Sequence, residues 1–374
     1  MIERIQLNLL AGPSLPLPVP SVIIQAIKSI QVTVSSGQRS GFQIVLANSK
    51  TSPISTVLIP AGLLDPGIRV VIVVTVNGMP NVLMDGVITR QEAGFSNEIG
   101  QSAVTLTGED LTVLMDLEKR QGVIFPPLNA VGQVLWLLKN YLVHGIIPVP
   151  VPEIFPDVPI PTDRVQSQDG TDFEFIQRLA HDNGYVFYLD PGPAPGMSKA
   201  YWGPEIRIGI PQPALSIDMD AMTNVDSLSF SFDGLQGKQV TVRIQEPTTK
   251  LSFDIPLPDI TLLVPPLSIR PAPKLKKEPL AGTAKFGPIL ALAKGAAAVA
   301  ESADAVSGNG QLNVLRYGRV LSPRALVGVR GAGIAYDGLY YVKSVTHNIK
   351  AGEYTQSFSL SRGGLVSITP VVPV

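Results

Sequence analysis

The stretch DGTDFEFIQRLAHDNGYVFYLD, residues 169–190, contains a helix signal and a strand signal in direct succession. The part from Asp169 to Gly184 begins with residues that cap helix N-termini and ends with Asn-Gly, which favours a helix C-terminus. The run Tyr185–Asp190 is short, apolar and aromatic, which indicates a buried strand. We therefore expect a helix and a strand that belong to a helical unit in the middle of the chain.

Segments with alternating apolar and polar residues precede this unit. They are rich in β-branched residues, as strands are. We expect strands at Ile2–Leu10, Ile27–Ser35, Gly41–Asn48, Arg69–Gly78, Asn81–Phe95 and Ser102–Asp110. Strands at this density describe a small β-barrel or sandwich.

A second group of strand-like segments follows the middle unit. We expect strands at Glu205–Ile210, Val225–Asp233 and Gly237–Glu246, the last two as a hairpin, and further strands up to Leu365. A Pro-rich segment, 247–288, and an Ala-rich helix at roughly 288–305 lie between them. The second β-rich unit is therefore expected to be split by an insertion.

Helices are also expected at Glu109–Arg120 and Asn129–His144, where apolar residues recur at helical spacing. The Pro-rich segments Ala11–Val22 and Gly145–Pro161 are expected to be loops, and the latter can form neither a helix nor a central strand. The residues alone thus predict a mainly β chain with α insertions, an α+β fold with two barrels and a helical middle.

The composition excludes several kinds of functional site. The 374 residues include no cysteine, which excludes disulfides, thiolate metal sites and cysteine nucleophiles. Apolar residues make up 45% of the chain and charged residues only 16%, and an excess of apolar surface indicates protein partners. We find no apolar run long enough for a membrane span, no signal peptide and no basic, aromatic patch for nucleic acid.

Acidic residues occur in pairs at three places. The pairs are Glu109 with Asp110, Asp116 with Glu118, and Asp218 with Asp220. The first suits a helix N-terminus, the second an exposed helix face and the third a turn, so we expect none of them to act as an acid and base pair.

Histidines and glycines give no catalytic pattern either. His144, His181 and His347 lie too far apart in sequence for a metal motif, and we expect His181 at a helix C-terminus and His347 as a satisfied histidine on a strand. No G-x-S-x-G elbow is present, and GVRGAG, residues 328–333, is better explained as a turn than as a nucleotide loop. The sequence therefore predicts no enzyme activity and no catalytic, cofactor-binding or metal residues.

Two stretches resemble the baseplate hub family of contractile injection machines, which includes contractile phage tail hubs, late control protein D and the hub part of type VI secretion valine-glycine repeat spike proteins. The helix of the family is matched by Asp172, Phe173, Phe175, Ile176, Arg178, Leu179, Ala180, Gly184 and Tyr185. The closing hairpin is matched by Gly338, Tyr340, Val342, Val345, His347, Gly352, Tyr354, Gln356, Phe358, Leu360 and Arg362.

The resemblance implies a homotrimer in which each chain contributes two tube-like β-barrels, so that six barrels form a ring that matches a six-fold tail tube. The expected units are a first barrel at 1–118, a helical middle domain at 119–204, and a second barrel at 205–247 and 308–366. The remaining parts are an insertion at 248–307 and a tail at 367–374.

The implied function is a structural hub that connects the inner tube to a spike, which a separate protein is expected to supply because the chain ends soon after its last hairpin. The implied partners are the inner tube protein, the spike protein, other baseplate proteins, and cargo or a tape-measure protein in the lumen. Assembly is expected in the bacterial cytoplasm, in a phage tail or injection particle. Strand residues that face the lumen should be polar or charged, although the sequence does not assign the faces.

A second hypothesis stays open at this point. The acidic pairs and the twin β-rich units also suit a β-rich surface or carbohydrate-processing protein. That hypothesis predicts lost activity when Asp218 or Asp220 is changed to Asn, and it requires an export signal.

Overall fold

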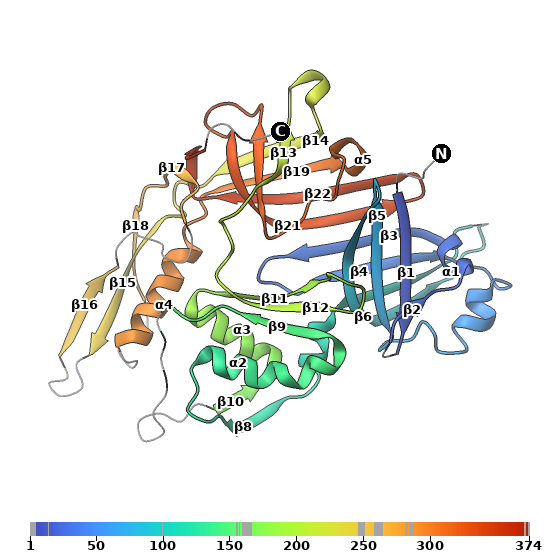
Figure 1. The fold of residues 1–374 in the computed structure, drawn as a ribbon, viewed down its shortest axis with the longest axis horizontal. Helices are drawn as coiled ribbons and strands as arrows, with labels where there is room; N and C mark the ends of the chain where they lie inside the picture. The colour runs from blue at the N-terminus through green and yellow to red at the C-terminus, as the bar shows by residue number, and fades with distance from the viewer. Residues whose placement is uncertain are drawn as a thin grey trace.

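The computed structural model describes residues 5–13, 15–98, 100–154, 156, 158, 167–245, 251–257, 265–280, 283, 288–369 and 372. Parts of the segments 145–161 and 247–288, of the first expected strand and of the tail 367–374 lie outside these residues. The chain is mainly β, with helices gathered in the middle unit and the insertion (Figure 1). The expected class, mainly β with α insertions, is confirmed.

The first β-rich unit contains the expected strands. Its elements are β1 (Ile5–Gly12), β2 (Leu17–Pro18), α1 (Ser21–Gln25), β3 (Ile27–Ser35), β4 (Gly41–Ala47), η1 (Ile54–Leu58), β5 (Arg69–Val76), β6 (Met79–Gly94) and β7 (Ala103–Asp110). The Pro-rich segment 11–22 contributes only the end of β1, Ala11 and Gly12, and the two residues of β2 to the described sheet, since proline lacks the N–H that a ladder needs.

The second β-rich unit has strands on both sides of the insertion in the sequence. Its elements are β13 (Gln212–Ser216), η4 (Asp220–Met222), β14 (Val225–Phe232), β19 (Val306–Asn313), α5 (Val314–Tyr317), β20 (Leu326–Arg330), β21 (Gly338–Lys350), β22 (Glu353–Arg362) and β23 (Gly364–Ser367).

Two predictions for this unit are wrong. Residues 205–210 form no strand, because Pro204 and Pro211 flank them and Gly209 bends the chain with φ 134°. Strand β14 forms no hairpin with residues 238–245, because it pairs with β19 instead. Leu228 and Phe230 of β14 pack on the main core.

Both units order their strands in the same way. The first unit reads β3-β4-β7-β6-β5 and the second β14-β19-β22-β21-β20. Counted from β3 and from β14, each unit pairs its first, second, fifth, fourth and third strand in turn. A bulge lies at the same place near the start of β3 and β14, and another in the middle of β6 and β21. The two units are therefore repeats of one topology.

The two repeats join edge to edge into one sheet. Strand β21 pairs antiparallel with β3, from Ser344 opposite Ser35 to Lys350 opposite Ser29. The resulting path of strands runs from β14 at one edge to β1 and β2 at the other, and no ring of strands closes within the described chain. Two closed barrels per chain therefore stay a prediction.

The middle unit contains short strands and two main helices. Its elements are η2 (Leu111–Met115), β8 (Arg120–Ile124), α2 (Ala130–Leu138), η3 (Lys139–His144), β9 (Ile146–Pro150), β10 (Ser167–Gly170), α3 (Asp172–Asn183), β11 (Val186–Pro191) and β12 (Ser198–Gly203). Helix α3 begins with a capping box between Thr171 and Glu174 and ends at Gly184, whose φ of 67° suits glycine. The helix and the strand predicted from residues 169–190 are confirmed.

Other predictions for the middle unit need correction. Residues 109–120 form no long helix, because β7 continues to Asp110 and β8 begins at Arg120. Between them Asp110 caps the short helix η2, and the Asp116 side chain accepts hydrogen bonds from Arg39 and Thr171. In α2 the buried side follows the apolar spacing only in part: Val134 and Leu138 are buried, but Gln133 is buried too and Leu135 is exposed. Strand β9 lies at the edge of its sheet, as its prolines require.

The insertion forms a separate small sheet with a helix on it. Its elements are β15 (Lys238–Gln245), β16 (Ser252–Pro256), β17 (Ser268–Pro271), β18 (Lys276–Leu280) and α4 (Pro288–Glu301). Helix α4 lies between β15 and α3 (Figure 1). A Cβ at Gly295 would lie 2.4 Å from Val242, so the small residues of α4 allow this close approach.

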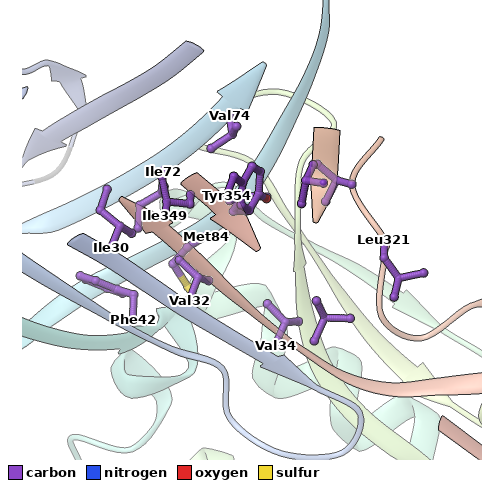
Figure 2. Packing of buried hydrophobic residues seen from close by; sticks show 14 of the residues in the cluster. Ile30, Val32, Val34, Phe42, Ile72, Val74, Met84, Leu321, Ile349 and Tyr354 are labelled. Carbon is purple, nitrogen blue, oxygen red and sulfur yellow. The ribbon is translucent and has the colours of Figure 1, made fainter. Parts of the chain in front are cut away.

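One hydrophobic core extends across the joint between the repeats. Figure 2 shows Val32 and Ile72 of the first unit near Ile349 and Tyr354 of the second. A second core belongs to the middle unit, where Phe175 stacks on Phe125 at 5.0 Å.

We expect Phe175→Asp and Leu179→Asp to unfold the middle unit, because each would bury an unpaired charge, and Leu179→Ala to cost about 2 to 5 kcal/mol. Both residues are buried on α3. Chemical denaturation would measure the loss. The control Gln177→Ala should change the free energy of unfolding by less than about 0.5 kcal/mol. Unchanged stability of Leu179→Asp would contradict this placement of α3.

Candidate functional site: the sheet and its polar face

One face of the continuous sheet is lined by uncharged polar side chains. Successive residues of a strand point to opposite faces, and cross-strand partners share a face. The residues of this polar face are Ser227, Ser229, Ser231, Ser307, Asn309, Gln311, Asn313, Thr355, Ser357, Ser359, Ser361, Ser344, Thr346, Asn348, Ser29, Gln31, Thr33, Ser35, Gln43, Thr105 and Thr107. The alternate residues of the same strands, such as Ile30, Val32 and Phe358, are buried in the core.

The polar face extends across both repeats and the joint between them. At the joint the Thr33 and Thr346 hydroxyls lie 3.1 Å apart, and within the second repeat the Ser344 and Ser359 hydroxyls lie 2.7 Å apart. Val45 and small residues interrupt it only on β4 and β7. The structure therefore shows which strand residues face the core and which form the polar face.

Among the described residues, charged side chains lie only at the margins of this face. Each of them stands beside a residue of opposite charge. Lys350 stands opposite Glu353 at the turn between β21 and β22. Arg90 forms an ion pair with Glu92 on β6. At the other end of the strands Glu109 pairs with Arg39 at 2.7 Å. The centre of the polar face carries no formal charge among the described residues.

Arg324 connects all three units behind the joint. Its guanidinium donates to the carbonyl oxygen of Ser35 at 2.8 Å and to that of Leu189 at 3.0 Å. It also stacks over the Tyr188 ring, 3.7 Å from the centroid. Arg324 is 7% exposed and has φ 62°, so the surrounding structure holds it in an unfavourable backbone conformation.

A second buried arginine fixes the segment between the middle unit and the second repeat. Arg207 forms ion pairs with Glu205 and with Asp304, each at 2.6 Å. The Arg207 charge outweighs burial and holds the pKa of the Asp304 carboxyl well below its usual range. While Arg207 points inward, the neighbouring Ile208 and Ile210 are 74% and 96% exposed, which leaves an apolar strip for a partner.

The acidic pairs have structural roles in this arrangement. Asp110 accepts bonds from the Ser40 and Thr112 backbone N–H groups, and burial raises the pKa of its carboxyl. Glu109 and Asp116 both bind Arg39. Glu118 lies 3.7 Å from Arg120 at the surface.

The third acidic pair lies in an exposed turn. Asp218 and Asp220 have φ values of 52° and 48° around η4. Neither lines the hollow beside Tyr188 or the two hollows beside Ile24 and Ile210.

The histidines also lie where the sequence places them. His181 is in the last turn of α3, and His144 ends η3. His347 is buried, with its Nδ1 atom 2.8 Å from the Tyr354 hydroxyl, and burial lowers its pKa to about 3. His347 is therefore a satisfied, neutral core histidine.

The described residues offer little for a ligand. No three His, Asp or Glu side chains gather among them as a metal site would require. An open hollow of about 490 Å³ lies beside the joint and is lined by Tyr188, Ile206 and Leu321 among others. None of the helices in the described part of the chain has the length and apolar character to cross a membrane.

Comparison with known proteins shows similarity only in structure. No protein family model and no curated protein sequence matches the chain. The tail protein from Neisseria meningitidis MC58 is similar with a TM-score of 0.66, 13% identity and coverage of 97% of this chain and 98% of the other. The E. coli c3393 protein, a type VI secretion component described as similar to T4 tail proteins gp27 and gp5, has a TM-score of 0.50, 11% identity and coverage of 93% and 76%.

A chain of the Francisella PdpA-VgrG complex is also similar, with a TM-score of 0.56, 10% identity and coverage of 100% of this chain and 60% of the other. At these identities the likeness concerns the fold. The structural neighbours are thus phage tail proteins, a type VI secretion component and a VgrG complex, and the resemblance inferred from the two sequence stretches is confirmed.

We expect His347 to make the protein less stable as the pH falls. The unfolded histidine, with pKa about 6.5, binds a proton before the native one, whose pKa is about 3. Its contribution is fully present above pH 6.5 and decreases by about 1.4 kcal/mol per pH unit below it. Urea unfolding at pH 7 and pH 5 would show a smaller difference for His347→Gln than for the unchanged protein. Equal differences for the two proteins would contradict the burial of a neutral His347.

We expect Arg324→Ala to lower the free energy of unfolding by about 3 kcal/mol, because two buried carbonyl groups would lose a charged donor. Arg324→Lys should recover only part of this loss, since an ammonium group cannot reproduce the planar fork. The surface Arg316, paired with Asp226, is the matched control, and Arg316→Ala should cost less than about 1 kcal/mol. Equal losses at the two positions in thermal or urea unfolding would refute the role of Arg324.

Proposed function

We propose that the chain is a non-enzymatic hub subunit that forms a ring of three copies and connects an inner tube to a spike in a contractile phage tail or a related injection system. The observation that carries this proposal is the joint between β21 and β3. Each chain forms this joint once internally. It keeps one unpaired edge that is equivalent to the β21 edge and one that is equivalent to the β3 edge.

One free edge is part of β6 in the first repeat, and the other is β14 in the second. Within the described chain, residues 90–94 of β6 pair only with β7, whereas the equivalent residues of β21 pair with both β22 and β3. Strand β14 likewise pairs with β19 alone among the described strands, whereas its equivalent β3 pairs with both β4 and β21. The neighbour of β6 would therefore be a strand like β14, and the neighbour of β14 a strand like β6. A second copy of the chain supplies both.

The internal joint also gives the register of the joint between copies. The bulges make Glu92 of β6 equivalent to Thr346 of β21, since each follows its bulge by the same number of residues. Ser231 of β14 is likewise equivalent to Thr33 of β3, since each follows the bulge near the start of its strand by the same number of residues. Because Thr346 stands opposite Thr33, Glu92 of one copy should stand opposite Ser231 of the next.

Three copies with two repeats each would give six repeats around one axis, which suits a six-fold tube. A closed ring of this kind would leave neither the β6 edge nor the β14 edge open to further association. The polar face would then line the channel, and the exposed Ile208 and Ile210 would lie on the outer side. The middle unit occupies only one end of the strands, where Asp116 reaches Arg39, so the other end is free to stack on the tube.

The units of this hub would be the domains expected from the sequence, except that β15 pairs with the insertion strands β16 and β18. The similar proteins support spike and baseplate partners, since their names include tail proteins and a VgrG complex. Assembly in the bacterial cytoplasm and a channel that holds cargo or a tape-measure protein belong to the same proposal. The carbohydrate-processing hypothesis gains no support from the acidic pairs, because Glu109, Asp110 and Asp116 are held in structural contacts.

We expect the purified protein to have the mass of three 39.8 kDa chains in light scattering at micromolar concentration. A stable dimer would reject the ring. If the protein is monomeric alone, the same measurement on the complex with its tube or spike partner should give three copies per particle, and any other number would reject the proposal.

Cysteine cross-linking would test the joint between copies, since the chain has no cysteine of its own. We expect Glu92→Cys with Ser231→Cys to give covalent dimers and trimers on a non-reducing gel after oxidation, because the two positions lie at opposite edges of one chain. The matched control is Thr33→Cys with Thr346→Cys, which should cross-link only within the chain. Assembled trimers that give no cross-linked species from the first pair would refute the proposed register.

A further inference from the structure

The β6 edge carries charged residues at positions where the internal joint has none. These are Arg90 and Glu92, which form an ion pair with each other at the surface. Their equivalents on β21 are the uncharged Ser344 and Thr346, which pair with β3. The charges therefore distinguish the joint between copies from the joint within the chain, and the inference drawn from them rests on the proposed function.

The register of the joint between copies gives Arg90 a partner. Within the chain, Ser344 stands opposite Ser35. Arg90 is equivalent to Ser344, since each is the first paired residue after the bulge of its strand. Asp233 directly follows β14 and is equivalent to Ser35, since each lies the same number of residues beyond the bulge near the start of its strand. Arg90 of one copy should therefore stand opposite Asp233 of the next.

We propose that an ion pair between Arg90 of one copy and Asp233 of the next determines which strand edges join when the ring closes. Residues opposite each other on antiparallel strands have Cβ atoms about 4.5 to 5.5 Å apart, within reach of a guanidinium and a carboxylate. Both residues are exposed in the single chain. The Oδ1 atom of Asp233 accepts a hydrogen bond from the Leu235 backbone N–H at 2.8 Å, whereas its Oδ2 atom accepts none from the described residues.

An exposed phenylalanine at the other end of the same edge supports this register. Phe95 directly follows β6 and is 71% exposed, although its equivalent on β21, Ile349, is only 7% exposed. Ile349 stands opposite Ile30 at the internal joint, and the equivalent of Ile30 on β14 is the partly buried Leu228. The joint between copies would therefore cover Phe95 with Leu228, just as the internal joint covers Ile349.

The ion pair makes closure of the ring sensitive to salt. The attraction between exposed charges extends over about 10 Å at 0.1 M salt but only about 3 Å at 1 M. It also favours the correct encounter of two edges, because like charges placed opposite each other across an interface repel. The internal joint has serines at the equivalent positions, so this sensitivity belongs to the joint between copies alone.

Charge reversal would test the pair. We expect Arg90→Asp alone and Asp233→Arg alone each to raise, by at least about tenfold, the protein concentration at which half of the chains are assembled in light scattering. A mixture of the two variants should assemble at a lower concentration than either alone, because the changed edge of one then meets the changed edge of the other. Rings captured through a tag on one variant should contain both. A role within a single chain could not be restored in this way by another chain.

Two further variants serve as controls. Arg243→Asp is matched, because Arg243 pairs with Asp254 at the surface of the insertion, and it should leave assembly unchanged. Arg90→Ser with Asp233→Ser reproduces the uncharged pair of the internal joint. This double variant should still form rings but lose much of the difference in assembly between about 0.05 and 0.5 M NaCl. Single reversals that assemble like the unchanged protein, or a mixture that assembles no better than its components, would overturn the proposal.

Failure of the ion pair and failure of the ring remain distinguishable. If the unchanged protein, alone or with its tube or spike partner, forms no particles of three copies, the ring and the ion pair are both rejected. If it forms them and charge reversal has no effect in the same sample, the ring stands and the ion pair alone is rejected. Urea unfolding of each variant should match that of the unchanged chain, since both side chains are exposed, so a loss of assembly reports the joint.

Discussion

The antiparallel pairing of β3 with β21 is the contact on which the rest of the structure depends. It connects strands more than 300 residues apart in the sequence, from Ser35 opposite Ser344 to Ser29 opposite Lys350. Two sheets that each bury one face become one sheet with one core and one polar face. The free edges of β6 and β14 follow from the same pairing, because each repeat can satisfy only one of its two edges within the chain.

Buried charges fix the angle at which the units meet. Arg324 reaches Ser35 of the first repeat and Leu189 of the middle unit from a loop of the second repeat. Hydrophobic packing alone would allow the units to slide, since apolar contacts have no direction. A guanidinium group that must satisfy several oxygens at fixed angles permits one arrangement only. A subunit that has to meet an identical neighbour in register benefits from this rigidity.

Local patterns predicted local elements well and pairings poorly. The strands of the first repeat and helix α3 follow from alternation and capping residues close together in the chain. The pairing of β14 with β19 does not follow from local patterns, because β19 lies beyond the insertion in the sequence. The next apolar strand after β14, which is β15, packs against α4 instead. Residues 205–210 alternate like a strand, but Arg207 is buried and Ile210 exposed, since the ion pair with Asp304 outweighs hydrophobic burial. The polar face was visible in runs such as TQSFSLS, residues 355–361, yet only the pairing of strands from two repeats shows that it is continuous.

This arrangement gives a physical reason for the low charge content of the chain. Solvent-exposed strand faces in ordinary proteins carry Lys and Glu, which favour solubility and discourage edge association. Here the residues that alternate with the core are Ser, Thr, Asn and Gln instead, and the ionic groups are mostly paired or buried. A face that is polar enough to remain hydrated but carries little charge opposes association less than a charged face does, so it suits a surface that other copies cover or enclose. The proposed ring would enclose this face, and the open strand edges beside it are the means by which such a ring would close.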